Sequence, residues 1–228
     1  MLGRLVLVLL IYVDFQCKVY LYFYLKLYIE CTDMKKTNHP PKGSKTTVDP
    51  IRNEKDIQRI KKSLQSNLRD LLLFTIGINN GLRIGDILKL KVQDVKDLKV
   101  GESLTIREQK TGKENILMVN KSVYAILQKY LNEKKPADGD YLFKSRKGAN
   151  APLSVPAANR MVKEWTFGMK GNYGTHSLRK TFGYIQRTKF GVGFEILSRR
   201  YNHSNPATTM RYLGIQSKEV NAILMNEI

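Results

Sequence analysis

The chain has 228 residues, a length that suits one domain, or a domain with an appendage, and is enough to bury a hydrophobic core. Its 39 Lys and Arg against 20 Asp and Glu give a formal charge of +19, which indicates a polyanionic partner, either nucleic acid or an anionic membrane surface. An apolar content of 42% with 26% charged residues argues against wholesale disorder, and two cysteines are too few for a disulfide scaffold.

Residues 1–33 form an apolar leader that differs from the rest of the chain. The leader is electrically neutral overall, so residues 34–228 carry the whole charge of +19. It also contains both cysteines, Cys17 and Cys31. Because residues 34–228 hold no cysteine, they need no disulfide and offer no thiolate metal ligand, which is typical of a protein of the reducing cytosol.

Charged residues interrupt the apolar leader, so the sequence does not predict a membrane-spanning helix there. Its apolar runs at 5–13 and 19–29 are separated by Asp14 and Lys18, and about 18 uncharged apolar residues in a row would be needed. A membrane role is therefore the weaker alternative. Met34 with two following lysines favours a leader that is translated from an upstream start and is either non-native or disordered.

A basic arm and a mainly helical domain follow the leader. Residues 34–50 are polar, basic and proline-containing, which is typical of a flexible arm. The pattern from 51 to 228 predicts a mainly α fold with a small antiparallel β-sheet. Helices are expected at 54–66, 68–79, 84–90, 121–133, 156–168, 176–188, 194–202, 206–213 and 217–226. Strands are expected at 104–106 and 116–119, joined by a turn at 110–113.

A histidine and an arginine mark the start of one expected helix. In Gly174-Thr175-His176-Ser177-Leu178-Arg179, the spacing places His176 and Arg179 on one helix face. A guanidinium and an imidazole at a helix N-terminus suit a phosphate, because the helix end adds backbone donors. For this pair alone, the favoured interpretation is that the two side chains are merely neighbours on a solvated helix face, where such spacings are common.

Two further segments carry side chains of interest. Residues 204–206 are a helix-start signal with Pro206 in the first turn, so His203 precedes a helix that carries Tyr212. In isolation Tyr212 is one of twelve tyrosines. Residues 81–90 place Arg83 on a turn before a short helix.

Taken together, these segments resemble a known family. Gly-Leu-Arg-Ile-Gly-Asp-Ile-Leu at 81–88, Lys-Thr-Gly-Lys at 110–113, His-Ser-Leu-Arg at 176–179 and Asn-His-Ser with Thr-Thr-Met-Arg-Tyr at 202–212 resemble the catalytic domain of the tyrosine recombinases, or phage integrases. The order is that of the family, over about 45–228. The resemblance implies the family's DNA breaking-rejoining fold and site-specific recombination through a 3′-phosphotyrosyl intermediate, with double-stranded DNA as the partner and no cofactor or metal.

The resemblance also implies roles for individual residues. Arg83 and Arg179 match the two arginines that clamp the scissile phosphate, and His203 matches a third donor. Tyr212 matches the nucleophile, and His176 matches the residue that takes its proton.

Lys110 of the turn matches the lysine that protonates the leaving 5′ oxygen, with Lys113 as the competing candidate. Asp86 matches an acidic residue that supports the first arginine, although it could equally be an acid that satisfies the helix dipole. The basic side chains expected to contact DNA are Lys35, Lys36, Lys113, Lys180 and Arg211.

The chain also departs from the family pattern. The N-terminal core-binding domain is apparently absent, so 51–228 is expected to act as a catalytic domain alone. Tyr201-Asn202 stand where a Leu-Gly pair is common in the family. The amphipathic segment at 217–226 is expected either to join protomers into a dimer or tetramer on DNA or to pack on its own domain.

Three functions remain open from the sequence. They are an active recombinase, a DNA-binding accessory or regulatory protein that keeps the fold, and a monomeric strand-relaxing enzyme like the type IB topoisomerases. Each implies a cytoplasmic, nucleoid-associated protein, with other DNA-binding proteins as possible accessories.

Overall fold

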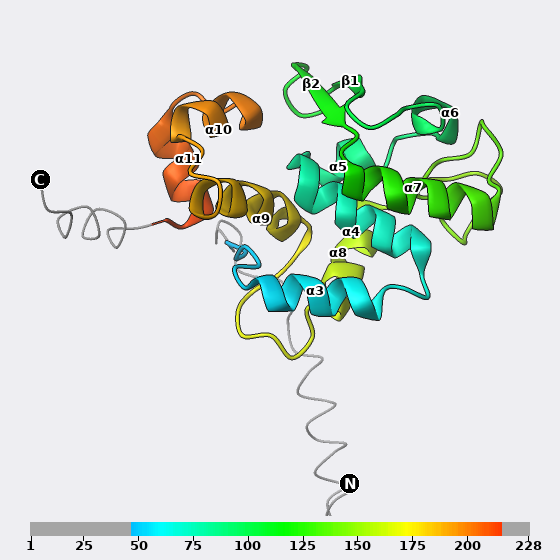
Figure 1. Cartoon of the computed structure of the whole chain (residues 1–228), viewed down its shortest axis with the longest axis horizontal. Helices are drawn as coiled ribbons and strands as arrows, with labels where there is room; N and C mark the ends of the chain where they lie inside the picture. The colour runs from blue at the N-terminus through cyan, green and yellow to red at the C-terminus, as the bar shows by residue number, and fades with distance from the viewer. Residues whose placement is uncertain (1–46, 216–228) are drawn as a thin grey trace, which may run out of the picture. The chain divides into compact units, whose positions relative to one another are not determined.

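The computed structural model describes residues 47–215, which form nine helices and a two-stranded antiparallel sheet (Figure 1). The predicted class, mainly α with a small antiparallel sheet, is therefore confirmed. The leader 1–33, Lys35, Lys36 and the expected helix at 217–226 lie outside the described residues.

The elements follow the predicted order with small shifts at their ends. They are α3 (Glu54–Ser63), α4 (Leu68–Asn80), α5 (Ile84–Ile87), α6 (Val92–Val95), β1 (Ser103–Arg107), β2 (Glu114–Met118), α7 (Lys121–Lys134), α8 (Val155–Trp165), α9 (Thr175–Thr188), α10 (Phe194–Tyr201) and α11 (Pro206–Leu213). The helix expected at 84–90 ends at Ile87, and α6 was not predicted. A one-turn helix is too short to show a helical period in the sequence.

Asparagine side chains fix the starts of four helices. The side-chain oxygens of Asn53, Asn67, Asn120 and Asn205 accept hydrogen bonds from backbone N–H groups in the first turns of α3, α4, α7 and α11. These bonds satisfy N–H groups that have no partner within the helix. Pro206, as the first residue of α11, has no N–H to satisfy.

The main hydrophobic core surrounds α4. Leu71, Leu72, Leu73 and Phe74 are all 1% exposed or less, so α4 is buried on every side of its middle turns. It packs against α7 on one side and α9 on the other. Figure 1 shows α9 between this larger group of helices and the α10–α11 pair. No helix within residues 47–215 has the length and apolar character needed to cross a membrane.

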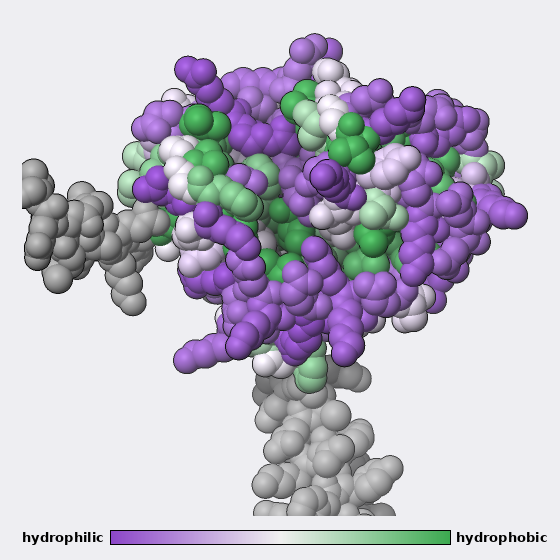
Figure 2. All heavy atoms as spheres, in the orientation of Figure 1, coloured by the Kyte–Doolittle hydropathy of each residue, from purple (hydrophilic) through white to green (hydrophobic). Residues whose placement is uncertain are grey.

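A second, smaller hydrophobic cluster holds α10 and α11 together. Its buried members are Phe194, Leu197, Tyr201, Leu213 and Ile215. It is separate from the cluster around α4. Figure 2 shows that the surface in this orientation is hydrophilic over most of its area, with smaller hydrophobic patches.

The sheet is a hairpin whose turn contains the predicted lysines. The strands pair from Ser103 opposite Met118 to Arg107 opposite Glu114. Gly112 has φ of 66°, which only glycine adopts readily, and its N–H donates to Glu108 O over 2.8 Å. The turn thus presents both Lys110 and Lys113 at its exposed end.

The last residues of the predicted arm are anchored to the domain. The N–H of Asp49 donates to Asn172 O over 2.7 Å, and the N–H of Asn172 donates back to the Asp49 carboxylate over 3.1 Å. The N–H of Ile51 donates to the Thr181 hydroxyl of α9. The chain therefore joins the domain before residue 50.

Candidate active site

Arg179 occupies the middle of the predicted catalytic set. It is 2% exposed, and two of its N–H donors bind backbone oxygens: Nη1 donates to Gly81 O over 2.6 Å and Nη2 to Tyr201 O over 2.9 Å. Gly81 caps the end of α4 with φ of 60°, which directs its carbonyl towards α9. Because both acceptors are neutral carbonyl oxygens, the guanidinium is held in place without a carboxylate to neutralise its charge, and it keeps further N–H donors on the side of Tyr212.

The Tyr201 side chain packs against Arg179 and binds its backbone. The guanidinium carbon lies 4.6 Å from the centre of the Tyr201 ring, and the Tyr201 hydroxyl donates to Arg179 O over 2.8 Å. A side chain at position 183 would collide with the Tyr201 hydroxyl, so Gly183 makes room for it. This support depends on the tyrosine that departs from the family pattern.

Arg83 is held by an acid that sequence analysis did not identify. Its Nη1 lies 2.5 Å from Oε2 of Glu108, whose side chain is 0% exposed. Glu108 also accepts hydrogen bonds from the Thr111 hydroxyl (2.6 Å) and from the Asn115 amide (2.8 Å). Burial alone would raise the pKa of Glu108, but these bonds and the Arg83 charge lower it to about 2. Glu108 thus links Arg83 to the hairpin turn as a permanent anion.

Asp86, the predicted partner of Arg83, makes a different contact. Its Oδ1 accepts a hydrogen bond from the N–H of Gln109 over 3.1 Å. The side chain is buried in α5, so it ties this helix to the hairpin just before Lys110. Asp86 therefore supports the site through the turn, while Glu108 pairs with the arginine. Glu108 lies only two residues from Lys110, and that proximity is the only signal in the sequence that could have identified it.

His176 lies among positive charges at the start of α9. Partial burial lowers its pKa, and the charges of Arg179, Lys110, Arg83 and Lys180 lower it further. The charge of Lys110 is among those that act on the imidazole, which places Lys110 near His176. A neutral imidazole at neutral pH can accept a proton.

His203 is placed by the turn between α10 and α11. Asn202 ends α10 with φ of 56°, a left-handed conformation that asparagine tolerates, and replaces the glycine common in the family. The N–H of His203 donates to Ser198 O, and its Nδ1 lies 2.9 Å from the Thr209 hydroxyl. The imidazole contacts the Tyr212 ring edge-to-face, with centroids 5.2 Å apart.

Tyr212 places a buried hydroxyl in this cationic setting. The hydroxyl oxygen makes no hydrogen bond of good geometry among the described residues, although the Arg179 guanidinium lies close enough to contribute one. Burial raises the pKa of Tyr212, and the charges of Arg179 and Arg83, with that Arg179 contact, partly oppose the rise. The ammonium of Lys180 lies 4.9 Å from the centre of the Tyr212 ring. Of the side chains expected to contact DNA, Lys180 is only 8% exposed, whereas Arg211 and Lys113 are exposed.

Arg200 is a further, partly buried guanidinium that sequence analysis missed. It donates to Asn80 O at the end of α4 and to the Asn115 side chain and Ile116 O of β2. Burial lowers its pKa. These bonds join α10 to α4 and to the hairpin, which holds His203 near the arginines. Its partners lie more than 80 residues away in sequence, so no local pattern indicates this role.

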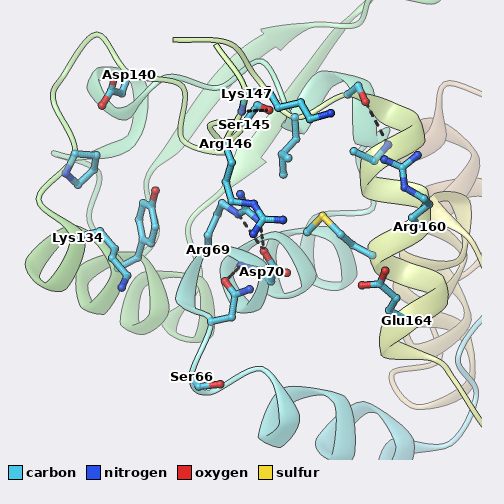
Figure 3. A pocket seen from close by; sticks show the side chains of 17 residues that line it. Ser66, Arg69, Asp70, Lys134, Asp140, Ser145, Arg146, Lys147, Arg160 and Glu164 are labelled. Carbon is cyan, nitrogen blue, oxygen red and sulfur yellow. Dashed lines mark hydrogen bonds and ion pairs between the residues drawn. The ribbon is translucent and has the colours of Figure 1, made fainter. Parts of the chain in front are cut away.

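A separate polar cleft lies between α4, α7 and α8. It has a volume of about 1060 Å³, and none of the six predicted catalytic residues lines it. Figure 3 shows Arg160 and Glu164 projecting from α8, with Arg69 and Asp70 at the start of α4. The basic side chains lining it are Arg69, Lys134, Arg146, Lys147 and Arg160. Within residues 47–215, no group of three His, Cys, Asp or Glu is arranged to hold a metal ion.

Comparison with known proteins gives one consistent family. Residues 52–219 match the model of the phage integrase family. The probable integrase/recombinase YoeC of Bacillus subtilis is 40% identical over 180 residues, covering 77% of this chain and 94% of YoeC. Tyrosine recombinase XerA of Pyrococcus horikoshii is 28% identical over 168 residues, covering 73% of this chain but only 57% of XerA.

Solved structures share the same fold. The XerA recombinase crystal structure matches with a TM-score of 0.63 at 22% identity, covering 83% of this chain and 68% of that one. The XerH site-specific recombinase bound to a palindromic difH substrate, a post-cleavage complex, also has a TM-score of 0.63, at 21% identity, and covers 83% of this chain and 57% of XerH. The predicted recombinase catalytic-domain fold is thus confirmed.

Proposed function

Because the chain belongs to the phage integrase family, we propose that it breaks and rejoins DNA strands through a covalent bond between Tyr212 and a 3′ phosphate. The observation that carries this proposal is the setting of the Tyr212 hydroxyl. It is buried, makes no hydrogen bond of good geometry among the described residues, and lies beside the Arg179 guanidinium within the electrostatic influence of Arg83. A buried hydroxyl that lacks a well-formed hydrogen bond is costly, and a phosphate bound between these cations would supply one.

The two arginines would bind the phosphate. Attack on a phosphodiester accumulates negative charge on its non-bridging oxygens, and two fixed guanidinium groups stabilise that charge. Arg179 keeps donors available because neutral carbonyls hold it in place. Glu108 orients Arg83 through an ion pair. The Arg83 guanidinium would therefore interact with two anions, the Glu108 carboxylate and the phosphate.

Proton transfer would use the groups on either side of the phosphate. His176, neutral because its pKa is lowered, takes the Tyr212 proton as the phenolic oxygen attacks phosphorus. Lys110 protonates the departing 5′ oxygen. The product is a 3′-phosphotyrosyl enzyme and a free 5′ hydroxyl, and attack by a 5′ hydroxyl of another strand releases Tyr212 and reseals the DNA. The covalent bond conserves the phosphodiester energy.

The wider assembly belongs to the same proposal. Exchange of strands between two duplexes needs more than one active site, which supports a dimer or tetramer on double-stranded DNA. XerH, a structural neighbour, is bound to its DNA substrate in the solved complex. The segment expected to join protomers, 217–226, lies outside the described residues. Action on chromosomal DNA would place the protein on the nucleoid.

A nicked suicide duplex, which traps the covalent intermediate, tests this function. Wild-type protein should form a DNA adduct that resists sodium dodecyl sulfate, and Tyr212→Phe should lose the adduct while still binding DNA. Tyr141→Phe, a tyrosine change outside the predicted site, should keep it. Binding without any adduct would instead support an accessory protein. Relaxation of supercoiled DNA without strand exchange would support the topoisomerase-like alternative.

A further inference from the structure

A chain of three short contacts connects His203 to the backbone of α10. Nδ1 of His203 lies 2.9 Å from Oγ1 of Thr209, and that oxygen lies 2.8 Å from Oγ of Ser198. Ser198 Oγ in turn lies 2.6 Å from Phe194 O, to which it donates. Thr209 is 0% exposed and Ser198 is 5% exposed, so water does not compete for these atoms.

The direction of each hydrogen bond follows from counting protons. Phe194 O is a carbonyl oxygen and can only accept, so it takes the single hydroxyl proton of Ser198. If Ser198 instead donated to Thr209, two oxygens 2.6 Å apart would face each other without a proton between them. Ser198 therefore accepts from Thr209, which uses the only proton of Thr209. The Thr209 oxygen must then accept from His203, so Nδ1 of His203 carries a proton.

We infer that Ser198 and Thr209 are positioning residues that hold neutral His203 as the Nδ1–H tautomer, which leaves the other ring nitrogen, Nε2, without a proton. Neither residue was identified from the sequence, because each is an ordinary helix hydroxyl until the other is placed beside it. Nε2 gains a proton only when the whole imidazole becomes charged.

This tautomer has a consequence for phosphate binding, and that consequence rests on the proposed function. A bare Nε2 lone pair repels a phosphate oxygen, so His203 can act as the third donor only after it takes up a proton from solvent. In the free protein burial lowers the pKa of His203, and Arg179 and Arg83 lower it further, against an opposing effect of Glu108. The ionisable groups of neighbouring elements that face it are Arg179 (α9), Arg83 (α5), Glu108 (after β1), Tyr201 (α10) and Tyr212 (α11).

Nitrogen NMR of the free, full-length protein tests the tautomer directly. The chain has only three histidines, so the ring ¹⁵N signals can be assigned with a His203→Asn variant. At a pH where His203 is neutral, the wild-type protein should show a protonated Nδ1 and an unprotonated Nε2. A proton on Nε2 in neutral wild-type His203 would overturn the inference without any variant.

Variants test whether the two hydroxyls set that tautomer. Ser198→Ala frees the Thr209 proton to bond Nδ1, and Thr209→Val removes the acceptor, so both should move the His203 proton to Nε2. Thr209→Ser keeps the hydroxyl and should behave as wild type, and His176 provides an unchanged reference signal. If the proton stays on Nδ1 in both Ser198→Ala and Thr209→Val, the positioning role is wrong.

A pH profile of adduct formation separates this inference from the proposed function. In wild type and Thr209→Ser, adduct yield should fall as the pH rises through the titration of His203 in the DNA complex. In Ser198→Ala, neutral His203 already carries Nε2–H, so this fall should disappear. An unchanged fall in Ser198→Ala would contradict the linkage to phosphate binding. Absence of any adduct in wild type would overturn the proposed function but leave the NMR result standing.

Discussion

At the scale of single residues, the site holds its two arginines in different ways. Arg179 is fixed by neutral carbonyl oxygens, so its whole charge is available to a ligand. Arg83 is fixed by Glu108, an anion at any physiological pH because its pKa is about 2. A buried pair of this kind orients both partners, and removal of one leaves the other charge uncompensated.

Substitution of Glu108 should change how stability depends on pH. The folded-state pKa is lowered from 4.5 to about 2, so the ionised carboxylate stabilises the fold above about pH 4.5, and this contribution is lost as the pH falls towards 2. At 1.36 kcal/mol for each pH unit, it amounts to about 3 kcal/mol. Glu108→Gln should therefore be less stable than wild type at pH 7, with the difference closing towards pH 2.

Urea unfolding at a series of pH values measures this difference. Glu114→Gln provides the matched control, since this exposed carboxyl lies on the same hairpin. Equal pH dependence in wild type and Glu108→Gln would show that Glu108 is not the stabilising anion.

The two turn lysines should differ in their effect on cleavage. The charge of Lys110 acts on His176, which favours Lys110 as the group that protonates the leaving oxygen. Lys110→Ala should slow adduct formation by roughly 10²- to 10⁴-fold, and Lys113→Ala should have a much smaller effect. A 5′-phosphorothiolate substrate, whose sulfur leaves without a proton, should restore the rate of Lys110→Ala. If it restores neither variant, neither lysine is the acid.

The residues that sequence analysis identified are those whose identity alone indicates their chemistry. Arg83, Arg179 and Tyr212 lie in short segments that resemble the family motifs. Glu108 and Arg200 were missed because their importance comes from partners that folding brings close. The acceptors of Arg200 lie on α4 and β2, 84 to 120 positions away. Local patterns carry no information about such contacts.

At the scale of elements, α9 is the part of the fold that positions the site. Its first turns carry His176 and Arg179, and its middle contacts Tyr201 through Gly183. Sequence patterns predicted its bounds to within one residue, since its apolar face has a clear helical period and a glycine precedes it. The close approach at Gly183 could not be predicted, because it depends on a side chain from another helix.

Gly183→Ala should therefore be destabilising, although alanine is normally favoured over glycine in a helix by about 1 kcal/mol. The new methyl group would collide with the Tyr201 hydroxyl and displace the ring that supports Arg179. We expect a loss of roughly 1–3 kcal/mol in the free energy of unfolding. Gly85→Ala is the matched control, because its methyl group would find its nearest neighbour at 3.9 Å. Thermal melts of both variants make the comparison, and equal stability of the two would contradict the close approach.

At the scale of the whole molecule, part of the net positive charge lies in a cleft away from the predicted catalytic residues. The cleft between α4, α7 and α8 is lined by five basic and three acidic side chains and lies apart from the catalytic set. Arg69 there is paired with Asp70. Arg146 and Arg160 make no ion pair within residues 47–215, so they can offer their charge to phosphates. Composition predicted the charge but not its distribution over the surface.

Neutralisation of this cleft should weaken DNA binding without a change of sequence preference. If Arg146 and Arg160 each contact one phosphate, each alanine variant should reduce the slope of log affinity against log salt by about 1. Lys99→Ala, an exposed lysine outside the cleft, should leave the slope unchanged. Titrations of a labelled duplex at several salt concentrations measure the slope. Slopes equal to wild type in both arginine variants would exclude the cleft from the DNA contact.

The division of the buried hydrophobic residues into two clusters has a consequence for when the proposed active site is assembled during folding. Tyr212 and His203 belong to the α10–α11 side, Arg83 belongs to the α4 side, and Arg179 bonds to both through Tyr201 O and Gly81 O. Parts of a domain with few buried apolar contacts open more readily than its main core. Under the proposed function, an opening of α10–α11 would carry Tyr212 away from the arginines, so a partly folded chain would not cut DNA.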